Sequence, residues 1–152
     1  MTMNQQPDNE QKANEVSQDK PDRRTASCAC GNLRITVTGD PSRVYACACL
    51  ECQRATGSGF SYRARFQKEA IIQVVGDRRI WRRGSDAGRW VEQTFCATCG
   101  TLVYLEGEAL PDAVVISVGC FADMTFAPPA AVFWASRRHP WYCLTEGVES
   151  VD

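Results

Sequence analysis

Cysteine is the residue type in this sequence that points most clearly to chemistry. Seven of the nine cysteines fall into three short clusters, with the sequences Cys28-Ala-Cys30-Gly31, Cys47-Ala-Cys49-Leu-Glu-Cys52 and Cys96-Ala-Thr-Cys99-Gly100. Thiolates separated by one or two residues can face a single ion, and cysteine sulfur is a preferred ligand of zinc. The clusters therefore predict two metal sites, one with four sulfurs and one with three.

Disulfide bonds are the first alternative for so many cysteines. They persist in oxidising compartments, and secreted chains begin with an apolar signal segment. Residues 1–24 are polar throughout, and an odd number of cysteines would leave one thiol unpaired. We therefore interpret the clusters as metal ligands and expect the protein to be cytoplasmic.

Glycines indicate which sulfurs share an ion. Cys30 and Cys99 are each followed by glycine, which reaches the positive-φ conformations of a sharply turning ligand loop. The third cluster has no glycine directly after Cys52. We therefore assign Cys28, Cys30, Cys96 and Cys99 to one tetrahedral structural zinc site, and Cys47, Cys49 and Cys52 to a second zinc ion.

A zinc ion with three protein ligands keeps a coordination position for water or substrate, whereas a four-sulfur site is closed. The triplet thus predicts an open, catalytic site. Two alternatives remain: an iron–sulfur centre, which uses the same ligands, and a second closed zinc site completed by Cys120, Cys143 or His139. Cys120 and Cys143 follow apolar or aromatic neighbours and also fit as free thiols.

The elements that position these clusters are predicted to be strands. Apolar and polar residues alternate from Leu33 to Thr38 and from Phe60 to Gln67, the period expected of half-buried strands. No stretch predicts a long amphipathic helix. Further strands are expected at 71–75, 79–82, 90–95, 101–105, 114–118 and 132–135. We predict a single all-β domain of short antiparallel strands with zinc-binding cysteine knuckles.

Composition limits the other classes of protein. Residues 1–26 are rich in polar residues and proline and are predicted to be a disordered tail, which leaves 27–152 as the zinc-binding domain. The net charge is −1, so the chain as a whole is no polyanion binder. No apolar run approaches the ~20 residues that span a bilayer, so no membrane segment is expected.

From Ser27 onward the sequence resembles the family of glutathione-dependent formaldehyde-activating enzymes, which includes centromere protein V. The resemblance rests on the order and spacing of the seven clustered cysteines, on Gln53-Arg-Ala-Thr-Gly57-Ser58 after the triplet, and on Pro140-Trp141. It implies a β-rich fold, a structural zinc on the four-cysteine set and a second zinc on the triplet. The family commonly has histidine where this sequence has Ala48, which can neither carry a proton nor donate a hydrogen bond.

The hypothesis for the reaction is a carbon–sulfur lyase chemistry at the triplet zinc. Zinc deprotonates a coordinating thiol at neutral pH. A glutathione thiol in the fourth position would then add to formaldehyde, giving S-(hydroxymethyl)glutathione, or the adduct would be cleaved in reverse. The expected partners are a thiol such as glutathione and a small aldehyde. The carboxylates of glutathione are predicted to be held by Arg54, Arg63 and Arg65.

A non-catalytic zinc-binding module that binds nucleic acid or protein is the alternative function. The segment Arg78-Arg79-Ile-Trp81-Arg82-Arg83 combines guanidinium groups with an aromatic ring, as nucleic-acid binders do. Asp77 and Asp86 lie beside it, and the overall charge does not favour a nucleic-acid partner.

Overall fold

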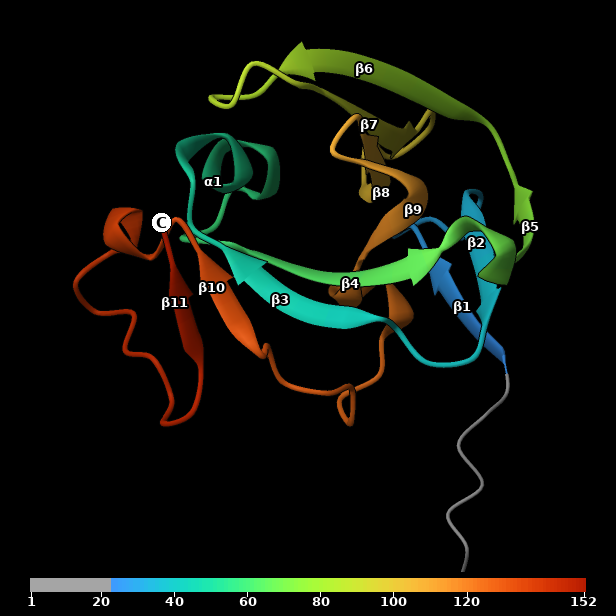
Figure 1. The fold of residues 1–152 in the computed structure, drawn as a ribbon. Helices are drawn as coiled ribbons and strands as arrows, with labels where there is room; N and C mark the ends of the chain where they lie inside the picture. Colours follow the sequence, from blue (N-terminus) through green and yellow to red (C-terminus); the bar gives the residue numbers. More distant parts are fainter. Residues whose placement is uncertain (1–22) are drawn as a thin grey trace, which may run out of the picture.

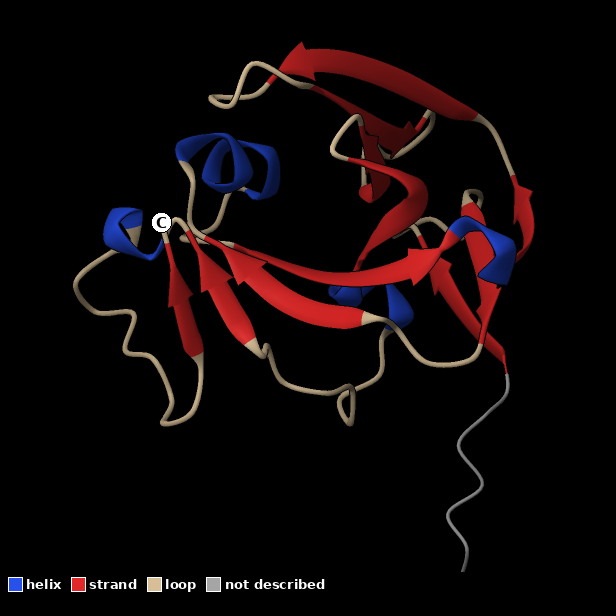
Figure 2. Ribbon diagram, in the orientation of Figure 1, coloured by secondary structure: helices blue, strands red, loops and turns tan. Residues whose placement is uncertain are grey.

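The computed structural model describes residues 23–152 of the chain. These residues form a small sheet and a large, strongly curved sheet, connected by turns and short helices (Figure 1, Figure 2). The strands are β1 (Arg23–Ser27), β2 (Arg34–Thr38), β3 (Arg43–Cys47), β4 (Ser61–Gln67), β5 (Ile71–Val75), β6 (Arg78–Gly84), β7 (Trp90–Cys96), β8 (Leu102–Gly107), β9 (Leu110–Ser117), β10 (Ala131–Phe133) and β11 (Glu149–Val151). The helical elements are α1 (Leu50–Thr56) and the 3₁₀ turns η1 (Lys68–Ala70), η2 (Val118–Phe121) and η3 (Ala135–Arg137).

The small sheet has the strand order β1-β2-β5, and the large one has the order β11-β10-β3-β4-β9-β8-β7-β6. All pairings are antiparallel except those that β10 makes with β3 and β11. The large sheet curls so that β6 and β7 arch over the face formed by β3 and β4, with α1 beside the opening (Figure 1). This curvature creates the concave face on which the triplet lies.

The structure confirms an all-β single domain. Each strand expected from the sequence is present, although the segment predicted as a strand at 132–135 divides into β10 and η3. The strands β1, β3 and β11 were not predicted. They are short, and β1 has the polar sequence RRTAS, so it depends on its full antiparallel pairing with β2 rather than on local propensity.

That pairing corrects the predicted boundary of the tail. Residues 23–26, which were assigned to the disordered tail, belong to β1, and Ala26 is fully buried. The rest of the predicted tail, residues 1–22, lies outside the described residues.

Both faces of β4 are buried, although its sequence alternates. Ala64 and Phe66 point into the main core, which contains Leu33, Ile35, Val37, Val103, Val114 and Ile116. The opposite side of the strand presents Ser61 and Arg63, which are also buried. Polar residues predicted to face solvent thus face the concave side of the curled sheet instead.

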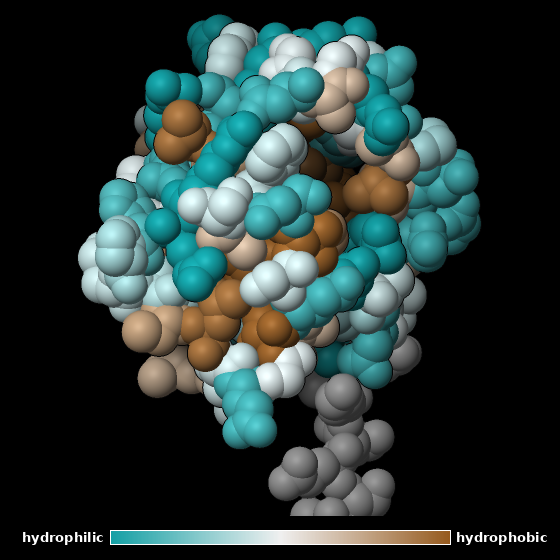
Figure 3. Space-filling model, turned by 60° about the vertical axis from the view of Figure 1, so that its left-hand side comes forward, coloured by the Kyte–Doolittle hydropathy of each residue, from teal (hydrophilic) through white to brown (hydrophobic). Residues whose placement is uncertain are grey.

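A second, smaller apolar cluster lies at the end of β3, beside β10. It contains Ala46, Ala48, Val132 and Ala135, with Phe60 and Tyr142 stacked at 4.4 Å beside them. Figure 3 shows the side of the molecule that carries α1, where apolar groups gather in hollows between polar ones. Within residues 23–152, no helix has the length and apolar character needed to cross a membrane.

Candidate metal centres

The four-cysteine cluster joins two turns that are far apart in the sequence. Cys28 and Cys30 lie in the β1–β2 turn, whereas Cys96 and Cys99 lie where β7 ends and turns toward β8. The four sulfur atoms lie within 4.8 Å of one another, with Cys28 Sγ 3.5 Å from Cys30 Sγ and Cys30 Sγ 3.7 Å from Cys96 Sγ. Four sulfurs around a tetrahedral zinc ion at about 2.3 Å lie about 3.8 Å apart, so the cluster fits such an ion.

The two turns have the same local structure. The amide of Gly31 donates to the Cys28 carbonyl and that of Gly100 to the Cys96 carbonyl, each at 3.0 Å. Both glycines have positive φ, 78° and 73°, as expected from the sequence. Backbone and hydroxyl donors also reach the sulfurs: the Leu33 amide lies 3.2 Å from Cys28 Sγ. A hydrogen bond with the Thr101 hydroxyl lowers the pKa of Cys99 to about 5.

The triplet is formed by the end of one strand and the start of a helix. Cys47 is the last residue of β3, Cys49 caps the N-terminus of α1, and Cys52 lies in its first turn. The Cys49 sulfur accepts a hydrogen bond from the Cys52 amide at 3.4 Å. The three sulfurs lie within 4.8 Å of one another. This arrangement could hold a metal ion with three protein ligands.

One side of the triplet faces a cavity of about 240 Å³, here called the triplet cavity. The three cysteines line it together with Tyr45, Ser61 and Arg63. Within residues 23–152, no histidine, cysteine, aspartate or glutamate supplies a fourth ligand atom within 4.8 Å of the three sulfurs. The described part of the chain therefore leaves one side of the cluster open to this cavity.

The residues considered as a fourth ligand lie elsewhere. Cys120 donates to the Leu102 carbonyl at 3.8 Å, and burial raises its thiol pKa to about 11. His139 Nε2 lies 3.0 Å from the Gln53 side-chain oxygen, and its ring stacks on Trp141. Cys143 is exposed.

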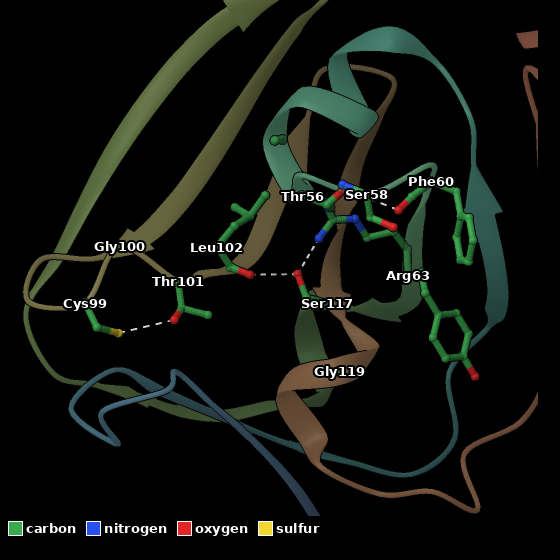
Figure 4. A pocket seen from close by; sticks show the side chains of 12 residues that line it. Thr56, Ser58, Phe60, Arg63, Cys99, Gly100, Thr101, Leu102, Ser117 and Gly119 are labelled. Atoms are coloured by element: carbon green, nitrogen blue, oxygen red, sulfur yellow. Dashed lines mark hydrogen bonds between the residues drawn. The ribbon is translucent and has the colours of Figure 1, made fainter. Parts of the chain in front are cut away.

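Arg63 lines the triplet cavity and is only 2% exposed. One of its terminal nitrogens, Nη1, donates to the Ser117 hydroxyl, which in turn donates to the Leu102 carbonyl at 2.8 Å (Figure 4). Among the described residues, its Nε and Nη2 have no hydrogen-bond partner, and it forms no ion pair. A buried cation of this kind is costly unless an anion lies near it.

Arg63 also lines a second cavity on its other side, shown in Figure 4 and here called the outer cavity. It has a volume of about 540 Å³ and lies between the end of α1, β4 and the β7–β8 turn. Ser58, Thr101 and Ser117 contribute hydroxyl groups to its wall. Arg63 therefore lines both cavities.

The other two predicted substrate-binding arginines lie apart from the triplet. Arg54 is exposed on α1 and does not line the triplet cavity, but it forms an ion pair with Glu51, which does line it. Arg65 follows Arg63 on the concave face, and its Nε donates to the Ser42 hydroxyl at 3.1 Å. Their role in substrate binding remains a prediction.

The thiols of the triplet act on one another's pKa. Hydrogen bonds from the Cys47 and Cys49 thiols lower the pKa of Cys52 to about 2, and the Ser61 hydroxyl and the Arg63 charge act in the same direction. Hydrogen bonds with Cys49 and Cys52 raise the pKa of Cys47, whose thiol keeps its proton and donates these hydrogen bonds. The cluster thus carries negative charge at neutral pH, which favours a bound cation.

Sequence reasoning did not identify Tyr45 and Trp134, which also line the triplet cavity. Tyr45 was hidden because β3 was not predicted, yet it lies directly across from Arg63 in the β3–β4 pairing. Trp134 has a φ of 54°, which is rare for a residue with a bulky side chain, and no sequence pattern predicts this backbone conformation.

Ala48 is fully buried in the small apolar cluster and does not line the triplet cavity. Because side chains alternate along β3 and its continuation, the side chain of residue 48 points away from the face that carries Cys47. The absence of histidine here therefore changes packing behind the triplet and removes no group from its cavity.

The arginine-rich segment considered for nucleic-acid binding is β6, at one end of the large sheet. Arg82 forms an ion pair with Glu92 and lies over the Trp90 ring, 4.5 Å from its centre. Arg83 lines the triplet cavity. Of the four guanidinium groups in this segment, that of Arg82 is engaged in the ion pair and that of Arg83 donates to the Gly84 carbonyl at 3.0 Å.

Comparison with known proteins agrees with this architecture. A crystal structure of a Rhodobacter sphaeroides protein, solved as a structural genomics target, is similar over 69% of this chain and 91% of its own, with a TM-score of 0.51 and 18% identity. At that identity the similarity concerns the fold alone. No curated protein matches the chain. The sequence model of the glutathione-dependent formaldehyde-activating enzymes matches residues 23–137, a span that contains all seven clustered cysteines, and the chain therefore belongs to this family.

Proposed function

We propose that the protein is a zinc-dependent carbon–sulfur lyase that forms and cleaves the adduct of glutathione, or a related thiol, with formaldehyde. The observation that carries the proposal is the three-sulfur cluster, which lies open to a cavity and lacks a fourth ligand among the described residues. Membership of the family supports the choice of thiol and aldehyde. We assign zinc to both clusters, two ions per chain.

Cys47, Cys49 and Cys52 would hold the zinc ion, which when bound would supply the Lewis acidity that makes an incoming thiol nucleophilic at neutral pH. The residues around it provide the rest of the site. Arg63 places a positive charge beside the anionic cluster, which would offset negative charge that develops on the reacting oxygen. Tyr45 lines the same cavity and carries a hydroxyl that would donate a hydrogen bond to the aldehyde oxygen.

The atoms of the reaction balance without a redox partner. The thiol sulfur forms a bond to the aldehyde carbon, the carbon–oxygen double bond becomes a single bond, and the thiol proton ends on that oxygen. The reverse reaction breaks the carbon–sulfur bond and returns the proton to sulfur.

Cobalt substitution combined with exchange NMR tests the proposal. The wild-type protein and a Cys143→Ser control should bind two cobalt ions, glutathione should shift the visible absorption of one of them, and the zinc protein should accelerate exchange between free and hydroxymethylated glutathione. Cys52→Ser should remove this spectral response and lower the acceleration about 100-fold or more.

Three results would contradict the proposal. They are a single metal per wild-type chain, a cobalt spectrum that glutathione leaves unchanged, and an exchange rate that the zinc protein does not alter.

A further inference from the structure

A second cavity, of about 320 Å³, continues from the triplet cavity along the concave face of the large sheet. We call it the aromatic cavity. Both cavities are lined by Cys47, Tyr45, Val91, Leu105 and Trp134. A molecule that reacts at the triplet can therefore extend into the aromatic cavity, starting at the sulfur of Cys47.

The walls of this cavity are aromatic and are held in place by neighbouring groups. Tyr45 and Phe133 pack edge to face with ring centres 5.2 Å apart, and Trp90 forms another wall. The Arg137 guanidinium lies 4.2 Å from the centre of the Trp134 ring, and its Nη1 pairs with Asp86 at 2.7 Å. This ion pair fixes a tryptophan whose backbone is in the unfavourable left-handed region. Fixed flat apolar walls favour a flat apolar ligand.

Apart from the sulfur of Cys47, the charged groups on the lining of the aromatic cavity are all arginines. Arg43, Arg65 and Arg89 line it, and no acidic residue does. Arg43 is paired with Glu149 at 2.8 Å, but within residues 23–152 neither Arg65 nor Arg89 forms an ion pair. Two unpaired guanidinium groups beside an apolar space favour a ligand that ends in a carboxylate.

Formaldehyde and glutathione do not account for this cavity. Formaldehyde has a single carbon and leaves the apolar walls uncovered, while glutathione is polar along its whole length. We infer that the site also accepts aromatic aldehydes that carry a carboxylate, with the ring in the aromatic cavity and the carboxylate at Arg65 and Arg89. This inference rests on the proposed function, because the carbonyl group would then lie at the triplet and take up a thiol.

The reaction is the same addition. The thiol sulfur bonds to the carbonyl carbon of the aromatic aldehyde, the thiol proton moves to the carbonyl oxygen, and the product is a hemithioacetal. No electrons are gained or lost, so no further reactant is required.

Binding is tested first, with a ligand that cannot react. 4-Methylbenzoate has the ring and the carboxylate but no aldehyde, and 4-methylbenzamide is its uncharged counterpart. Saturation-transfer NMR titrations of the zinc-loaded full chain should show that the benzamide binds about tenfold more weakly, because it lacks the charged partner of the arginines.

The matched variants are Ala109→Trp and Met124→Trp. Ala109 is exposed in the β8–β9 turn and lines the aromatic cavity but not the triplet cavity, while Met124 is fully exposed and lines neither. Ala109→Trp should weaken 4-methylbenzoate binding about tenfold or more by filling the space, whereas Met124→Trp should bind like the wild type. If Ala109→Trp does not retain two zinc ions and a native circular dichroism spectrum, Arg89→Gln replaces it, with the same expected loss.

The reaction is tested second, by exchange NMR with glutathione and either formaldehyde or 4-carboxybenzaldehyde. The wild type should accelerate both, and Ala109→Trp should lower the ratio of the aromatic rate to the formaldehyde rate about tenfold or more. If the wild type does not bind 4-methylbenzoate, or if the wild type and Ala109→Trp bind it equally well, the inference is overturned even if formaldehyde exchange is catalysed. Acceleration of formaldehyde exchange alone also overturns it. If neither aldehyde exchange is accelerated, the proposed function fails, whatever the binding titrations show.

Discussion

At the scale of single residues, Arg63 is the side chain on which the site most depends. Removing a guanidinium from water costs several kcal/mol unless a negative charge lies nearby. Three thiolates and one Zn²⁺ carry a net charge of −1, and Arg63 lies beside this cluster with two nitrogens that have no partner among the described residues. We therefore expect the cation and the metal–thiolate cluster to stabilise each other.

Replacing Arg63 with methionine keeps the length of the side chain and removes its charge. We expect Arg63→Met to lower the affinity of the triplet for cobalt about 10- to 100-fold without affecting the four-cysteine site, and Arg63→Lys to restore part of it. Competition with a metal indicator would measure both affinities, with Arg65→Met as the control. Equal affinities in Arg63→Met and the wild type would show that the charge does not act on the metal.

The sequence was informative about the cysteines and less so about their surroundings. Cysteine spacing is local, so the clusters could be recognised without knowing the fold. The alternation around Arg63 placed it correctly on a strand, but its burial arises from the curl of the large sheet, which no local pattern encodes. Tyr45 and Trp134 belong to a short strand and an irregular turn, and only pairing with distant strands brings them to the triplet.

At the scale of elements, α1 presents two of the three triplet cysteines and is held by one glutamine. The Gln53 side-chain amide donates to the Ala48 carbonyl at 2.8 Å and to the Arg137 carbonyl at 3.1 Å, which leaves its oxygen to accept from His139. This residue thus ties the helix to the end of β3 and to η3. The resemblance to the family included Gln53, but nothing in the sequence indicated these three bonds.

Gln53→Ala should therefore loosen the triplet while leaving the four-cysteine site unchanged. We expect weaker binding of the second cobalt ion and a loss of about 1–3 kcal/mol in the free energy of unfolding, since the carbonyl of the buried Ala48 loses this donor. Chemical denaturation and cobalt titration measure these effects, and Gln67→Ala, at the exposed end of β4, is the control. A change in the four-cysteine site of the same size would mean that the variant acts on folding in general.

At the scale of the whole molecule, the four-cysteine cluster joins the two sheets. Cys28 and Cys30 lie in the β1–β2 turn of the small sheet, and Cys96 and Cys99 lie at the β7–β8 turn of the large one. An ion held by all four closes a long loop of chain, so it restricts the unfolded state in the way a disulfide does. The pairing predicted from the two glycines is consistent with this role, because it connects distant segments rather than neighbours.

Loss of the metal from this cluster should therefore destabilise the entire domain. We expect Cys96→Ser to cost about 4 kcal/mol and to lower the melting temperature by about 10–20 °C, whereas Cys143→Ser should melt like the wild type. Differential scanning calorimetry of the zinc-loaded proteins provides the measurement. A melting temperature within a few degrees of the wild type would mean that hydrophobic packing alone joins the two sheets.

The position of Arg63 between the triplet cavity and the outer cavity has one more consequence. A guanidinium carries a single positive charge. An anion bound on one side of Arg63 therefore weakens the attraction of Arg63 for an anion on the other side. Anionic ligands in the two cavities would then weaken each other's binding without direct contact. By thermodynamic reciprocity, each would reduce the affinity of the other by the same factor.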